Sequence, residues 1–122
     1  MDSNGIVERK IRALGIRQRI EYLATTQWAD FSGHAYDTLS HSHVSLRLYL
    51  LISRAVLTEQ HKTHGMVVVL VNAYGATSNI IHGRSLAARV RSVQFDEWEA
   101  LLTEAERIVA RADHGASTAQ EV

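Results

Sequence analysis

Proline is absent from all 122 residues, and no other feature of the sequence constrains the fold as strongly. Because proline breaks helix interiors and is common in loops, a chain without it leaves nearly every segment open to helix formation. The content of 46% apolar and 21% charged residues is ordinary for one globular domain. We therefore expect a single all-α domain over residues 1–122, a compact bundle of four main helices plus short ones. Its core is expected to span about residues 6–114, with a flexible tail over 115–122.

Apolar residues near the amino terminus fall on two faces of the helical repeat. The first set is Val7, Ile11 and Leu14, and the second is Ile16, Ile20, Leu23, Ala24, Trp28 and Phe31. At 3.6 residues per turn the two sets lie on roughly opposite sides of one helix, which cannot bury both in a single groove. Either the helix breaks near Gly15, or its first turns pack on a different partner. We expect the break, with helices over about residues 6–14 and 16–31.

The apolar segment 44–57 predicts a buried helix, which we expect to run to about His64 and to close at Gly65. Its apolar residues wrap almost the whole circumference; they are Leu46, Leu48, Tyr49, Leu50, Leu51, Ile52, Val56 and Leu57. Such a helix is expected to be central in the fold and covered on most sides, either by its own chain or by a second copy.

Residues 66–71 form the ambiguous segment. Their sequence, Met-Val-Val-Val-Leu-Val, has the composition of a buried strand, which would make the fold α/β. A lone strand has no hydrogen-bonding partner, and no second strand is indicated in the chain, so we favour a helix. One face of that helix is small enough for another helix to approach closely; it carries Asn72, Gly75, Asn79 and Gly83. A further short helix is expected over residues 85–94.

The last helix has the clearest pattern. Asp96 is a good N-cap residue, and Glu99, three residues later, completes the spacing of a capping box. The apolar positions that follow recur on one face; they are Trp98, Leu101, Leu102, Ala105, Ile108, Val109 and Ala112. Gly115 is expected to end this helix.

Composition excludes several kinds of chemistry. The chain has no cysteine, so it can form neither a disulfide nor a thiolate metal site. Residues 1–10 lack the pattern of a secretion signal, and Arg47 and Arg54 interrupt the longest apolar stretch, which is too short to span a membrane. We expect a cytoplasmic protein that does not associate with a membrane and carries no cofactor.

Seven histidines raise the question of a metal site. His41 and His43 form one pair, and His61 and His64 form another. Zinc and iron sites in proteins take three or four convergent ligands, usually with carboxylates, and no Glu-x-x-His motif occurs here. The sequence therefore predicts no metal site. It also lacks the Gly-x-Ser-x-Gly elbow and the Gly-rich phosphate loop.

Arg54 and His61, separated by six residues, carry the one enzyme-like pattern. Their spacing resembles the Arg-x4–6-His pattern of HEPN-type ribonucleases, small four-helix proteins that often dimerise. The resemblance covers these two residues and implies that they would be catalytic and that RNA would be the substrate. The alternative is structural: Arg54 caps a backbone carbonyl, or pairs with Glu59 or with an acid of the last helix. We lean towards a protein that is not an enzyme.

The net charge of zero conceals a segregation of charge. Eleven basic and four acidic residues lie between Arg9 and Arg91, whereas two basic and seven acidic residues follow Ser92. The expected basic face comprises Arg9, Lys10, Arg12, Arg17, Arg19, Arg84, Arg89 and Arg91, and the expected acidic face comprises Asp96, Glu97, Glu99, Glu104 and Glu106. Surfaces of one sign attract the opposite sign. The basic face could bind nucleic acid, or it could pair with the acidic face within one chain or between two.

These features favour a non-enzymatic binding or assembly protein. We expect a small helical bundle, an adaptor, chaperone-like or structural subunit, that self-associates or holds a partner helix as small secretion chaperones do. The expected partner-binding residues are Arg47, Tyr49, Ile52, Arg54 and Val56. The first alternative is a nucleic-acid-binding subunit that uses the basic face, and the second is the HEPN-like ribonuclease.

Overall fold

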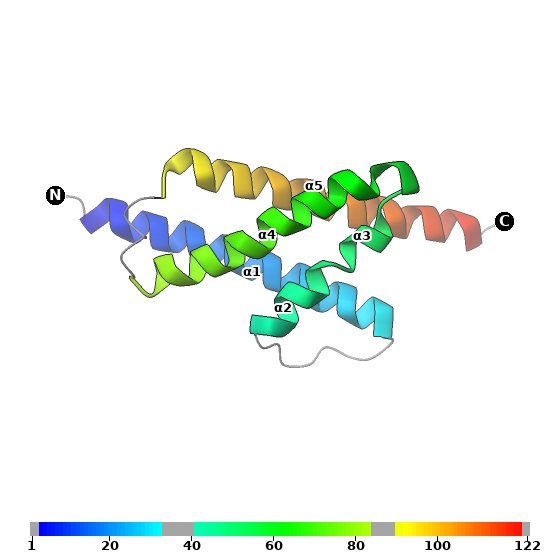
Figure 1. Ribbon diagram of the computed structural model, residues 1–122, viewed down its shortest axis with the longest axis horizontal. Helices are drawn as coiled ribbons and strands as arrows, with labels where there is room; N and C mark the ends of the chain where they lie inside the picture. Colours follow the sequence, from blue (N-terminus) through cyan, green and yellow to red (C-terminus); the bar gives the residue numbers. More distant parts are fainter. Residues whose placement is uncertain (1–2, 33–40, 84–89, 121–122) are drawn as a thin grey trace.

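The computed structural model describes residues 3–32, 41–83 and 90–120 (Figure 1). Its elements are helices α1 (Ser3–Ser32), α2 (His41–Leu48) and α3 (Leu51–Arg54), the 3-10 helix η1 (Leu57–Glu59), and helices α4 (Gln60–Ile81) and α5 (Ser92–Gln120). None of the described residues lies in a strand. The prediction of an all-α bundle is therefore confirmed. The α/β alternative is wrong, because residues 66–71 lie inside α4.

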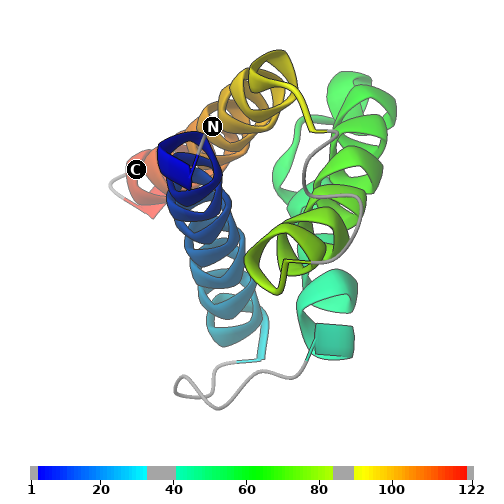
Figure 2. The ribbon, with the colours of Figure 1, turned by 90° about the vertical axis from the view of Figure 1, so that its left-hand side faces the viewer.

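Three long helices surround one core. α1 packs along α4 and along α5, α2 packs on α1, and α3 contacts both α4 and α5. α4 and α5 cross and then diverge towards the end of α4 and the start of α5 (Figures 1 and 2). The largest fully buried apolar side chains come from all of these helices: Ile16, Ile20, Val44, Leu48, Leu51, Val67, Leu70, Ile80, Phe95 and Leu102. Burial of this apolar surface is the main force that holds the helices together.

α1 is one continuous helix of 30 residues, so the predicted break at Gly15 is wrong. A single glycine inside a helix costs only about 1 kcal/mol, which the packing of a long amphipathic helix can offset. The apolar face that follows Gly15 enters the core through Ile16 and Ile20. The earlier face, with Val7, Ile11 and Leu14, remains exposed on the opposite side.

The predicted long helix over 44–57 is also wrong. The chain turns at residues 49–50 and is extended at Ala55 and Val56, so three short helical pieces precede α4. They lie at the periphery of the bundle rather than at its centre (Figure 1). An apolar pattern that covers the whole circumference cannot be buried by one straight helix in a small bundle. Breaking the helix buries Leu48, Leu51 and Ala55 and leaves others exposed.

The glycine and cap predictions for the later helices are also corrected. α4 runs through Gly65, α5 begins at Ser92 rather than after Asp96, and α5 runs through Gly115 to Gln120. The short helix expected over 85–94 lies partly outside the described residues, and residues 90–91 are not helical. Among the described residues, no helix combines the length and the apolar character needed to cross a membrane.

A glycine inside α4 and a glycine just after it should respond to alanine in opposite directions. Gly75 lies within the helix, and an added Cβ would meet nothing within 4 Å, so Gly75→Ala should raise the free energy of unfolding by about 1 kcal/mol. Gly83 follows the helix with a φ of +68°. Gly83→Ala should lower that free energy by about 1 kcal/mol, because a Cβ is strained in this region. Urea unfolding of the two variants and the wild type measures both effects. Equal changes in the free energy of unfolding would contradict the placement of Gly75 inside the helix and of Gly83 at a positive φ.

Candidate functional site

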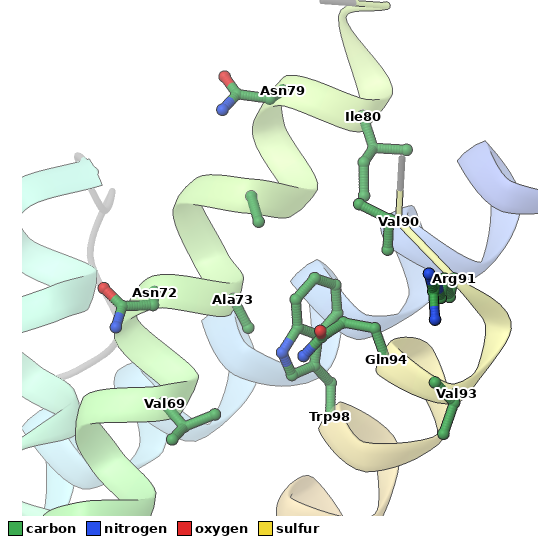
Figure 3. A pocket seen from close by; sticks show the side chains of 11 residues that line it. Val69, Asn72, Ala73, Asn79, Ile80, Val90, Arg91, Val93, Gln94 and Trp98 are labelled. Atoms are coloured by element: carbon green, nitrogen blue, oxygen red, sulfur yellow. The ribbon is translucent and has the colours of Figure 1, made fainter. Parts of the chain in front are cut away.

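A large hollow lies where α4 and α5 diverge. It has a volume of about 620 Å³. Its lining comes from α4 (Val69, Asn72, Ala73, Ala76, Asn79 and Ile80) and from the start of α5 with the residues before it (Val90, Arg91, Val93, Gln94 and Trp98). Figure 3 shows Trp98 and Gln94 reaching from α5 towards α4, while Asn72 and Asn79 point away from α5 and border the hollow. The floor is therefore apolar and the rim carries amides.

Two smaller hollows continue this one along α5: the second lies against α4, and the third lies against the end of α3 and residues 55–59. The second, of about 220 Å³, shares Val69 with the first, and it is also lined by Met66 and Leu101. The third, of about 320 Å³, shares Glu59 and Ile108 with the second. The shared residues make the three hollows neighbours. We call this continuous depression the α4–α5 groove.

The groove lies on the side of α5 that faces away from α1. The α1-facing side of α5 carries the carboxylates that bind arginines of α1: Asp96, Glu99 and Glu106. The groove side carries Trp98 and Leu101. An occupant of the groove would therefore contact α4 and α5 without displacing α1.

The charged residues of the groove are concentrated at one end. Among the described residues that line the large hollow, Arg91 is the one that carries a charge and none is a carboxylate; the amides of Asn72, Asn79 and Gln94 accompany it. At the other end, the smaller hollows are lined by charged residues of both signs: Glu59, Lys62, Glu104, Arg54 and Arg111. An apolar surface with one basic rim residue favours an apolar occupant that carries an acidic group.

The predicted basic and acidic faces meet inside the chain. Arg12 donates to Asp96 Oδ1 at 2.8 Å and also bonds Glu99, and Arg19 donates to Glu106 Oε1 at 2.6 Å. Hydrogen bonds to the carboxylates, chiefly that of Asp96, raise the pKa of Arg12, and the bond to Glu106 raises the pKa of Arg19. The Asp96–Glu99 spacing therefore serves as a clamp for a guanidinium rather than as the predicted capping box.

The other predicted basic residues do not form one surface. Arg17 lies 3.8 Å from the centre of the Tyr74 ring and donates to the Tyr74 carbonyl oxygen at 3.0 Å. The Lys10 amine lies near Gly83, at the end of α4. Arg91 lies at the groove, and Arg84 and Arg89 are outside the described residues. Of the predicted acidic residues, Glu104 pairs with Arg107, and Glu97 accepts a hydrogen bond from Gln94 at 3.5 Å.

The predicted partner-binding residues are not brought together on one face. The Arg47 guanidinium lies 4.7 Å from the centre of the Trp28 ring, and the Tyr49 ring lies 6.0 Å from that of His64. Ile52 packs against the core, whereas Val56 is exposed. These residues lie on α2, α3 and the segments that follow them, because the helix expected to carry them on one face is broken.

Arg54 joins three helices instead of facing His61. Its Nε donates to Oε1 of the buried Gln27 at 2.9 Å, and its Nη1 donates to Asp113 Oδ1 at 3.1 Å. This confirms the structural alternative of a pair with an acid of the last helix. His61 is exposed in the first turns of α4, beyond the break at residues 55–59, so Arg54 and His61 lie on different helices. The described side chains contain no group of three histidines or carboxylates arranged to hold a metal ion.

A second apolar surface lies on α1. Val7, Ile11, Leu14 and Tyr22 are 53%, 64%, 46% and 69% exposed, and with the exposed Gln18 they form a row that we call the α1 stripe. Their spacing of three or four residues places them on one side of the helix, opposite to Ile16 and Ile20. The sequence alternative in which the first turns pack on a different partner is not observed within the chain, because these side chains are exposed.

The groove residues were missed by sequence reasoning, although one signal pointed towards them. The small face of residues 72–83 was expected to receive another helix. In the structure Asn72 and Asn79 border the large hollow, Gly75 is exposed, and none of the described helices covers them. Val93 and Trp98 line the other side of the groove. They belong to α5, and the sequence alone could not predict how α5 packs relative to α4.

The fold and the groove together define a small all-α bundle with an open lateral groove. Comparison of the chain with protein-family models, with curated proteins and with solved structures returns no match.

Proposed function

We propose that this chain is a non-enzymatic binding or assembly protein that holds an amphipathic helix in the α4–α5 groove. The observation that carries the proposal is the hollow of about 620 Å³ between two diverging helices, with an apolar floor that includes Ala73, Ile80 and Trp98. Proteins that capture helices commonly use an apolar groove between two of their own helices. The occupant contributes apolar side chains at helical spacing.

The polar groups of the groove fit such an occupant. Asn72 and Gln94 border the hollow and can donate and accept hydrogen bonds, so polar side chains of a docked helix need not lose their hydrogen bonds. Ala73 and Ala76 are small, which lets a helix backbone approach α4 closely. The nucleic-acid alternative has weaker support, because Arg12, Arg17 and Arg19 are engaged by α5 and by Tyr74.

A substitution that fills the hollow tests this proposal. The probe is a fluorescently labelled, stapled helical peptide with leucines at i, i+4, i+7 and i+11 and with glutamates on its flanks. Ala76→Trp should weaken its binding at least about tenfold, since an indole in the hollow takes the space of the peptide's central side chains. Fluorescence anisotropy measures the dissociation constant.

The matched control is Ala110→Trp. Ala110 is exposed on α5 and lines none of the three hollows of the groove. This variant should bind the peptide as the wild type does, and circular dichroism should show both variants to be folded. Equal affinities for Ala76→Trp and Ala110→Trp, or no binding by the wild type, would rule out the groove as a helix-binding site.

A further inference from the structure

We infer that the α4–α5 groove receives the α1 stripe of a second copy of this chain. The inference rests on the proposed function, because it names the helix that the groove holds. The stripe has what an occupant of the groove needs: exposed apolar side chains at helical spacing, with Val7, Ile11 and Leu14 on successive turns. At a rise of 1.5 Å per residue, the stripe from Val7 to Tyr22 is about 22 Å long. The part of α4 that lines the large hollow, Val69 to Ile80, is about 16 Å long, so the stripe can span it.

Charge complementarity supports this occupant. Glu8 is exposed beside the stripe, and Arg91 is exposed at the large hollow. Neither has an ion-pair partner among the residues that the structure describes. The other flank of the stripe carries Lys10, whose amine is turned towards Gly83 of its own chain. Docking of the stripe therefore offers the carboxylate of Glu8 to the guanidinium of Arg91 in the neighbouring copy.

The positions of the two surfaces determine the kind of assembly. The stripe lies on the side of α1 away from α4 and α5, and the groove lies on the side of α5 away from α1. One copy thus presents the stripe and the groove in opposite directions. Contacts between different surfaces are heterologous, and they add copies head to tail unless a rotation closes the ring. The chain should therefore form a series of oligomers that grows with concentration rather than a single symmetric dimer.

Complementation between two defective variants is the decisive experiment. Ile11→Arg disables the stripe, and Ala76→Trp disables the groove. At concentrations at which the wild type forms oligomers, each variant alone should sediment as a monomer. The association constant of each variant should be at least about tenfold lower than that of the wild type. Mixed in equal amounts, they should form a dimer and nothing larger, because each pair retains one intact stripe and one intact groove. Analytical ultracentrifugation up to millimolar concentration resolves these species.

Leu46→Arg is the matched control. Leu46 is 68% exposed on α2 and lines none of the three hollows of the groove, so this variant should associate as the wild type does. Exchange of charges adds a second measurement. Glu8→Arg and Arg91→Glu should each weaken association about threefold, which is the scale of an exposed ion pair. The double variant that combines Glu8→Arg with Arg91→Glu should associate as strongly as the wild type.

Three outcomes would overturn the inference. In the first, Ile11→Arg abolishes association while Ala76→Trp retains it, which means that two stripes pair with each other. In the second, the mixture of the two variants stays monomeric. In the third, the wild type is monomeric at every concentration. If the third outcome occurs while the stapled peptide still binds in a manner that depends on Ala76, the proposed function stands and only the identity of the occupant is wrong.

Discussion

Leu102→Ala is expected to lower the free energy of unfolding by about 3 kcal/mol, within the range of 2–5 kcal/mol that such substitutions cost. Leu102 is fully buried in the middle of α5, in the core that α1, α4 and α5 share. Truncation removes apolar contacts and leaves a cavity, because closely packed helices relax only partly. A loss of this size is a large fraction of the total stability of a small domain, which is typically about 5–15 kcal/mol.

Urea unfolding followed by circular dichroism measures this effect. Leu57→Ala is the control, because Leu57 is 82% exposed and its truncation should change the free energy of unfolding by less than about 0.5 kcal/mol. Leu102→Met keeps most of the volume and should cost less than about 1.5 kcal/mol. A loss below about 1 kcal/mol for Leu102→Ala would mean that α5 is not held by this core.

The sequence predicted which faces are buried better than it predicted where helices end. Trp98, Leu102 and Ala105 were placed on the inner face of the last helix by their spacing, and all three are buried. Ile16 and Ile20 were likewise placed together, and both enter the core. Periodicity succeeds here because burial of one face is the main stabilising term for a helix in a bundle.

Helix ends were missed mainly because glycines were interpreted as breaks. Gly15, Gly65 and Gly115 all lie inside helices, whereas Gly83 follows the end of one and has a positive φ. The cost of a helical glycine is small against tertiary packing, so only the conformation of the chain distinguishes the two cases. The break at Ala55 has no glycine or proline to announce it. It follows from packing that no local pattern encodes.

The candidate site could be predicted only in its parts. Segregated charge indicated a contact between oppositely charged faces, and Arg12 and Arg19 do meet carboxylates of α5. Whether that contact lay within one chain or between two depended on how α1 and α5 pack. The groove likewise needs the divergence of α4 from α5, which places Val69 across from Trp98. Part of the α1 stripe was visible in advance, because Val7, Ile11 and Leu14 form an apolar face separate from the one that follows Gly15, although the break at Gly15 was preferred.

Tyr74 should make the stability of the protein fall at high pH. Its ring is buried, and its hydroxyl donates to Glu21 Oε2 at 2.9 Å. Burial, with a smaller contribution from the Glu21 carboxylate, raises the pKa of Tyr74 from 10.0 to about 12. Because the folded state holds the proton more tightly than the unfolded chain, the stabilisation is present in full below about pH 10 and is lost as the pH rises through about 12.

Tyr74→Phe removes the group that titrates. The free energy of unfolding of this variant should be about 1 kcal/mol lower at neutral pH, because the substitution removes the hydrogen bond to Glu21. Between pH 10 and 12 its stability should fall less steeply than that of the wild type. Tyr22→Phe is the control, because Tyr22 is 69% exposed and should leave the slope unchanged. Denaturant unfolding at intervals from pH 8 to 12 measures the slopes. The ultraviolet absorbance of tyrosinate should show one tyrosine that ionises late in the wild type and not in Tyr74→Phe. Parallel slopes for the wild type and Tyr74→Phe would show that the Tyr74 proton does not contribute to stability at high pH.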